Sequence, residues 1–242
     1  MNCVMSSPFF TTSKGDIKIT VEKCGDLRTN TGFIENKNRK EAILIDAPFG
    51  AFEKAGSIFS KETKIVAVLF THWHFDHIGD GHLFKELGAE TYSSIPSKEL
   101  IEDSSSMRSF FATFFSAFFC DTVPFKIDHE VTDKCTIDVC DWARFFCRLV
   151  PGHTTGDVAY YMELMNCLFT GDTMFSGCIG RSDFPGGNQE LLISGIKEKL
   201  FVFPHETLVV PGHGRLTTIG DEIANNRFSS VCRVSKNTEG IV

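Results

Sequence analysis

The sequence predicts a layered α/β fold in a single domain, residues 1–242. Its 242 residues, 42% of them hydrophobic, are enough for one large core. Short apolar runs of strand type alternate with segments of helical spacing in both halves of the chain, and no internal repeat or low-complexity linker separates the halves. This alternation is typical of helices layered on sheets rather than of separate domains.

The N-terminal third reads as strands. Residues 16–23 alternate between polar and apolar side chains, which predicts a strand with one buried face. The apolar positions are Ile17, Ile19 and Val21. Gly25 marks a turn before a second expected strand at residues 31–35. The run EAILIDAP, residues 41–48, is short and apolar, as expected of a strand buried on both faces.

The next segments predict alternating helices and strands. Helical periodicity covers residues 51–59, and residues 64–70 (KIVAVLF) form another buried-strand pattern that ends at THWHFDH. The spacing of residues 76–87 predicts a helix, with Gly88 at its C-terminal end.

A phenylalanine-rich helical segment is expected near residues 97–120. Its phenylalanines recur at i, i+1, i+4 and i+5, which places them on one broad helical face. They are Phe110, Phe111, Phe114, Phe115, Phe118 and Phe119. We interpret the segment as a helix packed on the core, and a lid, a wall of the substrate pocket or a dimer face are the alternatives.

Three later apolar runs resemble strands, and each leads into a histidine or an aspartate. They are ARFFCRLV at residues 143–150, NCLFTGD at 166–172 and ETLVVPGH at 206–213. Repeated placement of such residues after strands predicts one functional site at an edge of the fold.

Composition narrows the functional classes. The formal net charge of -7 argues against a nucleic-acid partner, because a surface that binds phosphates is normally basic. We see no secretory signal and no apolar run of the ~20 residues that would cross a membrane. The nine cysteines are odd in number and form no CxxC pair, so we expect reduced thiols and a cytoplasmic location.

A metal site is predicted by the segment His72-Trp73-His74-Phe75-Asp76-His77. Four potential ligands fall within six residues, directly after a buried strand. In an extended segment His72 and His74 lie on the same side, and Asp76 and His77 can turn toward a second position where a helix begins. A lone histidine is usually packed or hydrogen-bonded, but this spacing favours a metal held by imidazole and carboxylate.

Later strand ends supply three further ligand candidates. PGHTTGD contains His153, LFTGD contains Asp172, and PGHG places His213 between two glycines that allow a tight turn. The remaining histidines lack such settings, and we interpret them as structural or surface residues. They are His82, His129 and His205.

The pattern HxHxDH, followed by His, Asp and His at these intervals, resembles the metallo-β-lactamase superfamily over nearly the whole chain. The resemblance implies a four-layer αββα sandwich with the site at one edge of its two sheets. It also implies that one metal is bound by His72, His74 and His153. A second would be bound by Asp76, His77 and His213, with Asp172 bridging both.

The segments GDTMFSGCIGRSDFPGG and PGHGRLTTIGDE are similar to the short, single-domain members of the glyoxalase II group, which hydrolyse S-acylglutathione thioesters. Only 29 residues follow His213, so we expect no C-terminal glutathione-binding helical domain. The tyrosine common after the last metal histidine is replaced, since PGHG continues with Arg215, and the thiol carrier therefore stays open. The resemblance places Arg181 and Asp183 at the substrate, the alternative for Arg181 being a surface or structural ion pair.

The expected cofactors are two divalent ions, with zinc first and iron or manganese as alternatives. They would generate a hydroxide near neutral pH that attacks the substrate carbonyl, with Asp76 and Asp172 as the catalytic carboxylates. A thiolate can leave without a strong acid, so an anionic thioester is the expected substrate. Thr71, Thr154 and Asp157 lie beside ligands and are predicted to hold imidazole N–H groups, and Cys178 is interpreted as a packed thiol.

The main alternative is a persulfide dioxygenase on the same fold, whose GRTDF-type segment resembles residues 180–184. Those enzymes bind one iron and do not use the position of His213 as a ligand, whereas a two-metal hydrolase needs it. A β-lactamase, a nuclease and a non-catalytic binding module rank lower, because the full ligand set is present without an export signal or a basic surface. We expect a small-molecule substrate, no nucleic acid and no membrane as partners, and the oligomeric state stays open.

Overall fold

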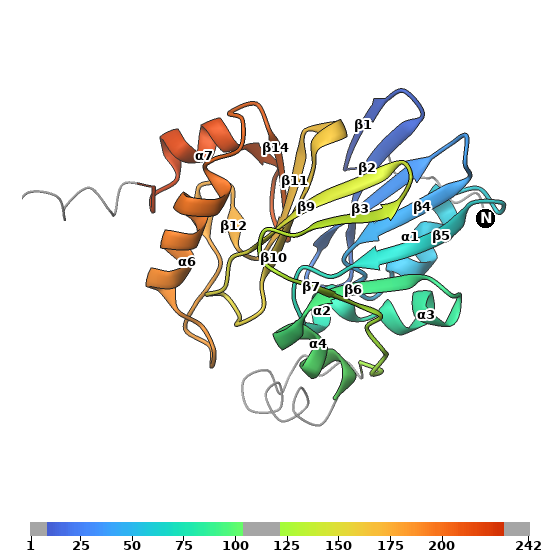
Figure 1. The fold of residues 1–242 in the computed structure, drawn as a ribbon, viewed down its shortest axis with the longest axis horizontal. Helices are drawn as coiled ribbons and strands as arrows, with labels where there is room; N and C mark the ends of the chain where they lie inside the picture. Colours follow the sequence, from blue (N-terminus) through green and yellow to red (C-terminus); the bar gives the residue numbers. More distant parts are fainter. Residues whose placement is uncertain (1–8, 104–121, 230–242) are drawn as a thin grey trace, which may run out of the picture.

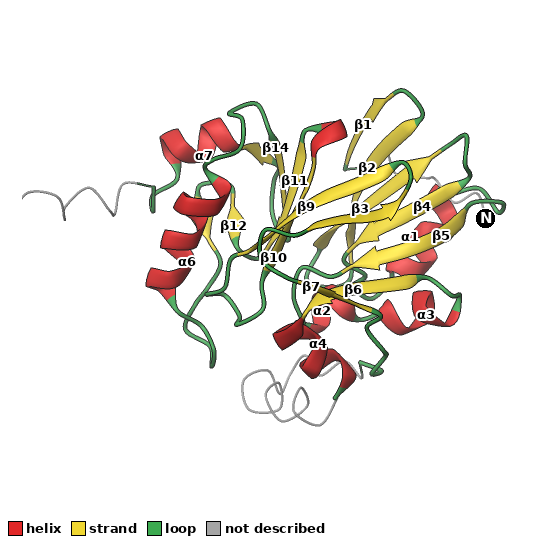
Figure 2. Ribbon diagram, in the orientation of Figure 1, coloured by secondary structure: helices red, strands yellow, loops and turns green. Residues whose placement is uncertain are grey.

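The computed structural model describes residues 9–103 and 122–229, and it has four layers (Figures 1 and 2). Two β-sheets pack face to face in the middle, and helices cover the outer face of each sheet. The predicted αββα sandwich is therefore confirmed.

The first sheet contains seven strands that follow one another in sequence order. Its strands are β1 (Phe10–Lys14), β2 (Ile17–Cys24), β3 (Thr29–Asn36), β4 (Glu41–Ile45), β5 (Lys64–Leu69), β6 (Glu90–Ser94) and β7 (His129–Val131). Strands β1 to β4 pair antiparallel, and β4 to β7 pair parallel. The carboxyl ends of the parallel strands consequently meet at one edge.

The second sheet has six strands in the order β15-β14-β11-β10-β9-β8. They are β8 (Thr136–Cys140), β9 (Ala143–Leu149), β10 (Val158–Met162), β11 (Cys167–Gly171), β14 (Leu208–Pro211) and β15 (Thr217–Thr218). Strands β11 and β14 pair parallel, so their carboxyl ends also meet. A small hairpin of β12 (Met174–Phe175) and β13 (Cys178–Ile179) follows β11.

Helices on one side cover the first sheet, and those on the other side cover the second (Figure 1). The first group is α1 (Ala51–Ile58), α2 (Phe75–Ile78), α3 (Gly81–Glu86) and α4 (Ile95–Glu102). The second group is α6 (Gln189–Gly195), its π-helical continuation η2 (Ile196–Leu200) and α7 (Ile219–Asn225), while the short η1 (Glu163–Met165) connects β10 to β11. Side chains cap two of these helices, since Asn188 accepts from the Leu191 amide and Thr218 from the Asp221 amide.

The core between the two sheets explains the sequence pattern. The alternating positions of β2 that were predicted to share a face are all buried there, namely Ile17, Ile19 and Val21. In β4, Ile43 and Ile45 face this core, whereas Ala42 and Leu44 face the helices of the first side. The prediction of a strand buried on both faces is confirmed.

The predicted helix over residues 76–87 is divided into α2 and α3 around Gly79 and Asp80. Tertiary contacts account for the division. The Asp80 carboxylate accepts a 2.9 Å hydrogen bond from the Phe52 amide, and the Asp80 amide donates to the Ala47 carbonyl at 2.8 Å. The ring of Phe49 packs directly against Gly79. These contacts with the loop before α1 and with the first turn of α1 fix the chain direction between the two short helices.

The expected phenylalanine-rich helical segment overlaps α4 at its start, and its residues from 104 on lie outside the described residues. Eight of the described strands were not anticipated individually from the sequence. They are β1, β6, β7, β8, β10, β12, β13 and β15. Their place in a sheet depends on backbone hydrogen bonds to neighbouring strands, which local sequence patterns do not reveal.

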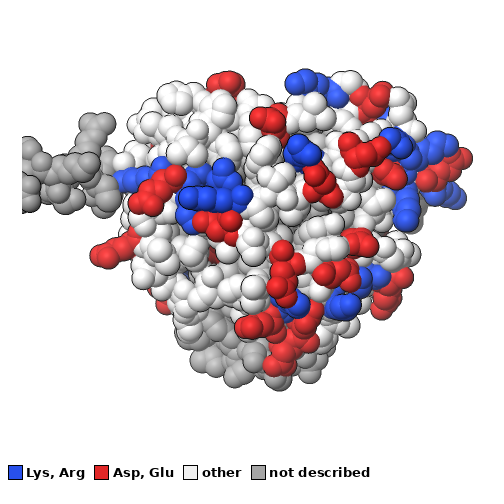
Figure 3. Space-filling view, in the orientation of Figure 1, with Lys and Arg blue, Asp and Glu red and all other residues white. Residues whose placement is uncertain are grey.

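On the face shown in Figure 3, acidic and basic side chains are interspersed, and more of both lie toward the right-hand edge, where the first sheet is in Figure 1. Among the described helices, none has the length and apolar character needed to cross a membrane. Six cysteines of the described ranges carry free thiols: Cys24, Cys135, Cys140, Cys147, Cys167 and Cys178.

Candidate metal centre

The predicted ligands follow the carboxyl ends of four strands from both sheets. His72 and His74 come after β5, His153 after β9, Asp172 directly after β11, and His213 after β14. Asp76 and His77 lie in the first turn of α2. Because the carboxyl ends of β5, β11 and β14 lie at the same edge of the sandwich, residues distant in sequence converge on one site.

Three buried imidazoles form the first cluster, which we call the histidine cluster: His72, His74 and His153. The Nδ1 atom of His74 lies 3.0 Å from Nε2 of His72 and 3.0 Å from Nε2 of His153. Nitrogens bound tetrahedrally to zinc at 2.0–2.1 Å would lie roughly 3.3 Å apart, which is close to this spacing. The three ring nitrogens therefore fit one metal ion.

Two rings of the histidine cluster, those of His72 and His74, are held in the neutral form that binds metals. Burial, together with the neighbouring histidines, lowers the pKa of His72 well below its ordinary value. Burial likewise lowers the pKa of His74 to about 3. Desolvation disfavours the charged imidazolium, so both rings carry a free lone pair at neutral pH.

Carboxylate and imidazole groups form the second cluster, which we call the mixed cluster: Asp76, His77 and His213. The Oδ2 atom of Asp76 lies 3.1 Å from Nε2 of His213 and 3.7 Å from Nε2 of His77. Although burial favours the neutral ring, the carboxylates of Asp46, Asp172 and Asp76 raise the pKa of His77 well above its ordinary value. The mixed cluster is thus rich in negative charge, as a site for a divalent cation requires.

Asp172 lies between the two clusters. Its Oδ1 is 3.3 Å from Nε2 of His77, and its Oδ2 is 3.6 Å from Nε2 of His213 and 3.7 Å from Nε2 of His153. Burial opposes ionisation, but the charges of His77 and His213 keep the pKa of Asp172 below its ordinary value. The carboxylate therefore occupies the position that a bridging ligand needs.

Two buried atoms without hydrogen-bond partners also indicate a metal site. Among the described residues, Nε2 of His77 and Oδ1 of Asp172 are buried and have no hydrogen-bond partner. Leaving such groups unpaired costs about 1–3 kcal/mol each, more for charged groups. A cation between them would satisfy both, so the geometry agrees with a metal ligand set rather than with a hydrogen-bonded core.

One positioning residue was missed by sequence reasoning, namely Asp46 at the end of β4. Its carboxylate accepts 2.8 Å bonds from the Thr71 amide, the Thr71 hydroxyl and Nδ1 of His77. The Thr71 hydroxyl in turn contacts Nδ1 of His72 at 3.1 Å. Asp46 thereby orients a candidate ligand in each cluster and directs Nε2 of both rings toward the candidate metal positions.

A signal for Asp46 was present in the sequence. Like the ligands themselves, it directly follows a buried apolar strand in EAILID. Its backbone has a φ of 60°, an uncommon conformation for a residue other than glycine, which is often found at functional sites.

Backbone carbonyls hold two of the remaining three rings. Nδ1 of His153 lies 2.7 Å from the Arg181 carbonyl, and Nδ1 of His213 lies 3.2 Å from the Leu27 carbonyl. The prediction that Thr71 contacts an imidazole is confirmed. The same prediction for Thr154 and Asp157 was wrong.

Asp157 instead orders the loop that carries His153. Its carboxylate accepts bonds from the amides of His153 and Thr154 at 3.0 and 2.7 Å and from the Thr154 hydroxyl at 2.6 Å. Burial raises the pKa of Asp157 to about 6. Adjacency in sequence brought these groups to the backbone of the loop, whereas the ring of His153 points away to the Arg181 carbonyl.

Two glycines allow the backbone to approach Asp172. A Cβ atom on Gly212 would overlap Oδ1 of Asp172, and one on Gly180 would overlap the Asp172 carbonyl. The PGHG motif is therefore explained by packing as well as by the turn that presents His213.

The predicted substrate contacts, Arg181 and Asp183, form an ion pair with each other. Nε and one terminal nitrogen of Arg181 each donate to Asp183 at 2.8 Å. The guanidinium also lies over the Phe184 ring, 3.6 Å from its centroid. Both side chains are more than half exposed, so the pair lies at the surface beside His153.

The remaining candidates lie apart from the two clusters. His129 stacks on Tyr92 and pairs with Glu90 at the surface, and neither His82 nor His205 belongs to a ligand group in the described ranges. Cys178 is half-buried in β13, and burial raises the pKa of its thiol, in agreement with a packed role.

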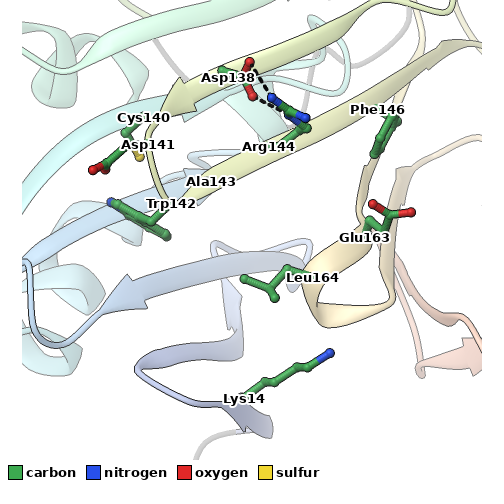
Figure 4. Close-up of a pocket in the computed structure, with 10 residues that line it drawn as sticks. All are labelled: Lys14, Asp138, Cys140, Asp141, Trp142, Ala143, Arg144, Phe146, Glu163 and Leu164. Atoms are coloured by element: carbon green, nitrogen blue, oxygen red, sulfur yellow. Dashed lines mark hydrogen bonds and ion pairs between the residues drawn. The ribbon is translucent and has the colours of Figure 1, made fainter.

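A cavity of about 790 Å³ lies away from the clusters, beside the turn between β8 and β9 (Figure 4). Charged side chains of both signs line it together with Trp142 and Leu164. Strand β9 runs from this turn toward His153, so the cavity lies at the opposite end of the strand from the ligands.

Comparisons with known proteins agree with this geometry. Residues 24–213 match the family model described as the metallo-beta-lactamase superfamily. The chain is 31% identical over 194 residues to hydroxyacylglutathione hydrolase GloC of Haemophilus influenzae, a match that covers 79% of this chain and 88% of that protein.

Two solved structures are similar. The BLEG-1 B3 metallo-beta-lactamase has a TM-score of 0.76 and 29% identity, with 88% of this chain and 99% of that chain covered. TTHA1623 in a di-iron-bound form has a TM-score of 0.72 and 28% identity, with 85% of this chain and 98% of that chain covered.

Proposed function

The chain belongs to the metallo-β-lactamase superfamily, and from this premise we propose that it is a binuclear hydrolase of thioesters such as S-acylglutathione. The observation that carries the proposal is the place of Asp172. Its two oxygens lie within 3.3–3.7 Å of ring nitrogens from both clusters. A bridging carboxylate between two complete triads supports two metal ions rather than one.

The residues divide into those that bind and those that face the reaction. His72, His74, His77 and His153 are almost fully buried, whereas the Asp76 and Asp172 side chains are 13% exposed and His213 is 28% exposed. When bound, two divalent ions supply a lowered pKa for water and polarisation of a carbonyl oxygen. On the open side, the Asp76 carboxylate can orient the attacking water and accept its proton.

The arrangement of acids supports a thioester. Asp46 and Asp157, the buried carboxylates that contact ligand loops, are committed to the bonds described above. Neither is placed to protonate a leaving group. A thiolate departs without a strong acid because thiols ionise near pKa ~8.5, whereas an amine would need a proton. The name of the relative GloC, a hydroxyacylglutathione hydrolase, agrees with this choice.

The alternative is a mononuclear iron persulfide dioxygenase on the same fold. The mixed cluster argues for hydrolysis, because His213 approaches Asp76 at 3.1 Å and completes a second triad. The metal itself stays a proposal, with zinc first and iron or manganese next. A similar protein has been solved with two irons, so iron alone would not favour the dioxygenase.

The test combines metal counting with turnover. We expect close to two metal ions per chain in protein purified without added metal, together with thiol release from S-lactoylglutathione. A β-lactam serves as the comparison substrate, because one similar structure is that of a metallo-beta-lactamase. Two metals without thiol release from any thioester would overturn the substrate class. One iron, with oxygen consumption on glutathione persulfide, would establish the alternative.

A cytoplasmic location, an anionic small-molecule substrate, the absence of nucleic-acid and membrane partners, and the oligomeric state stay predictions.

A further inference from the structure

A cavity of about 380 Å³ adjoins the mixed cluster and reaches Asp76 itself. Its walls come from the turn between β2 and β3 and from the loop between β4 and α1. Besides glycines, the lining residues are Leu27, Pro48, Phe49, Phe75, Asp26 and Asp76. The volume lies within the range of small-molecule pockets, roughly 300–1,000 Å³.

The walls of this cavity are tied to the metal ligands. The Leu27 carbonyl contacts Nδ1 of His213 at 3.2 Å, and the Ala47 amide donates to the His77 carbonyl at 2.7 Å. Phe49 packs against Gly79, in the turn that follows α2. The cavity is therefore a fixed part of the site, because its walls are joined to His77 and His213.

The opposite end of the site, beside the histidine cluster, is exposed and charged. Beside His153, the exposed pair of Arg181 and Asp183 offers charge, and the Arg181 carbonyl holds the histidine ring. The site thus has an open polar end at the histidine cluster and an apolar cavity at the mixed cluster.

We propose that the cavity beside Asp76 binds the acyl group of the substrate and selects uncharged, apolar acyl groups. This inference rests on the proposed thioester hydrolysis. A peptide-like thiol carrier is polar and suits the exposed end, whereas an alkyl chain gains free energy by leaving water for the walls formed by Leu27, Phe49 and Phe75. Asp76 is a proposed metal ligand, so the ions offset its charge and the remaining ionisable lining residue is the acidic Asp26. A carboxylate on the acyl group would also lose its hydration against the apolar walls, so the cavity disfavours it.

Acyl length gives the first test. Burying one methylene group is worth roughly a fourfold increase in kcat/KM. S-butanoylglutathione should therefore exceed S-acetylglutathione roughly tenfold, and S-succinylglutathione should be the poorest of the three. Binding of the non-hydrolysable S-butylglutathione and S-carboxypropylglutathione, measured by titration calorimetry, should show the same preference for the uncharged chain.

Reversal of the charge preference gives the second test. Leu27 is 41% exposed, so L27R adds a cation to the cavity rim without disturbing the core, and its carbonyl remains available to His213. We expect the ratio of kcat/KM for S-succinylglutathione over S-butanoylglutathione to rise at least about tenfold. The matched control is L164R, since Leu164 is 45% exposed and lines the distant cavity of Figure 4. The control should leave the ratio unchanged.

The outcomes separate this inference from the function on which it rests. An active enzyme that hydrolyses all acyl groups alike, or whose ratio is unchanged in L27R at full metal content, would overturn the acyl cavity and leave thioester hydrolysis standing. An enzyme with two metals that is inactive on every thioester would refute the proposed function, and this inference with it. A second variant, L27A, keeps the inference testable if L27R misfolds. L27A should widen the cavity and therefore favour S-hexanoylglutathione over S-butanoylglutathione.

Discussion

The two ligand clusters share one edge of the sandwich but differ in charge and exposure. The histidine cluster consists of three imidazoles that are at most 7% exposed. In the mixed cluster, Asp76 supplies a carboxylate, Asp172 adjoins it, and the His213 side chain is 28% exposed. The histidine cluster is therefore almost closed to solvent and offers nitrogen ligands alone, whereas the mixed cluster offers a carboxylate and a partly exposed imidazole.

The largest effect is expected from removing the centre of the histidine cluster. His74→Ala deletes the ring whose Nδ1 lies 3.0 Å from both partners, so metal content and activity should fall together. We expect a loss of kcat/KM of the order of 10³-fold, as for other groups that stabilise the transition state electrostatically. Metal analysis and thioester turnover measure it, with the surface variant H129A as the control. Full metal occupancy and turnover in H74A would remove His74 from the ligand set.

A smaller effect is expected in the mixed cluster. His213→Ala should reduce the metal content from two ions to about one, because the histidine cluster keeps all its ligands. We expect activity to fall about 10²-fold, since polarisation by the second ion is lost. Equal loss of both ions in H213A and H74A would show that the clusters are not independent, and would contradict separate metal sites in the two clusters.

Asp46→Asn tests the residue that joins the clusters. The neutral amide can donate toward Nδ1 of His77 and so disturb the tautomer that presents Nε2, and its effect should reach His72 through Thr71. Loss of such a supporting group typically costs 10–100-fold in metal affinity or activity. Competition with a chelator measures the affinity, and the exposed D16N serves as the control. A change confined to one metal would show that Asp46 supports only one cluster.

The smallest effect is expected at the polar rim. Arg181→Met removes the exposed ion pair with Asp183 but keeps the carbonyl that holds His153, so stability should change by no more than about 1 kcal/mol. If Arg181 contacts an anionic substrate, KM should rise about tenfold at unchanged kcat and metal content. An unchanged KM would leave Arg181 with the structural ion pair alone.

The sequence by itself predicted seven of the described strands and the candidate ligands that follow them, because both depend on local patterns. His72 and His74 lie on the same side because side chains alternate with period two in an extended chain. The apolar composition of residues 41–48 and 64–70 predicted the buried strands β4 and β5. The later ligand candidates were found in the same way, since each follows an apolar run and is preceded by a glycine.

Only the tertiary structure decided what those ligands contact. The bond from His77 to Asp46 spans 31 positions of the chain, and the contact of His213 with the Leu27 carbonyl spans 186. The break between α2 and α3 depends on Phe49 against Gly79, and the cavity beside Asp76 exists because two loops meet over that turn. Such contacts are set by the pairing of strands and the packing of loops rather than by spacing along the chain. For this reason the sequence predicted the candidate ligands, and the fold determined how they are oriented and what adjoins them.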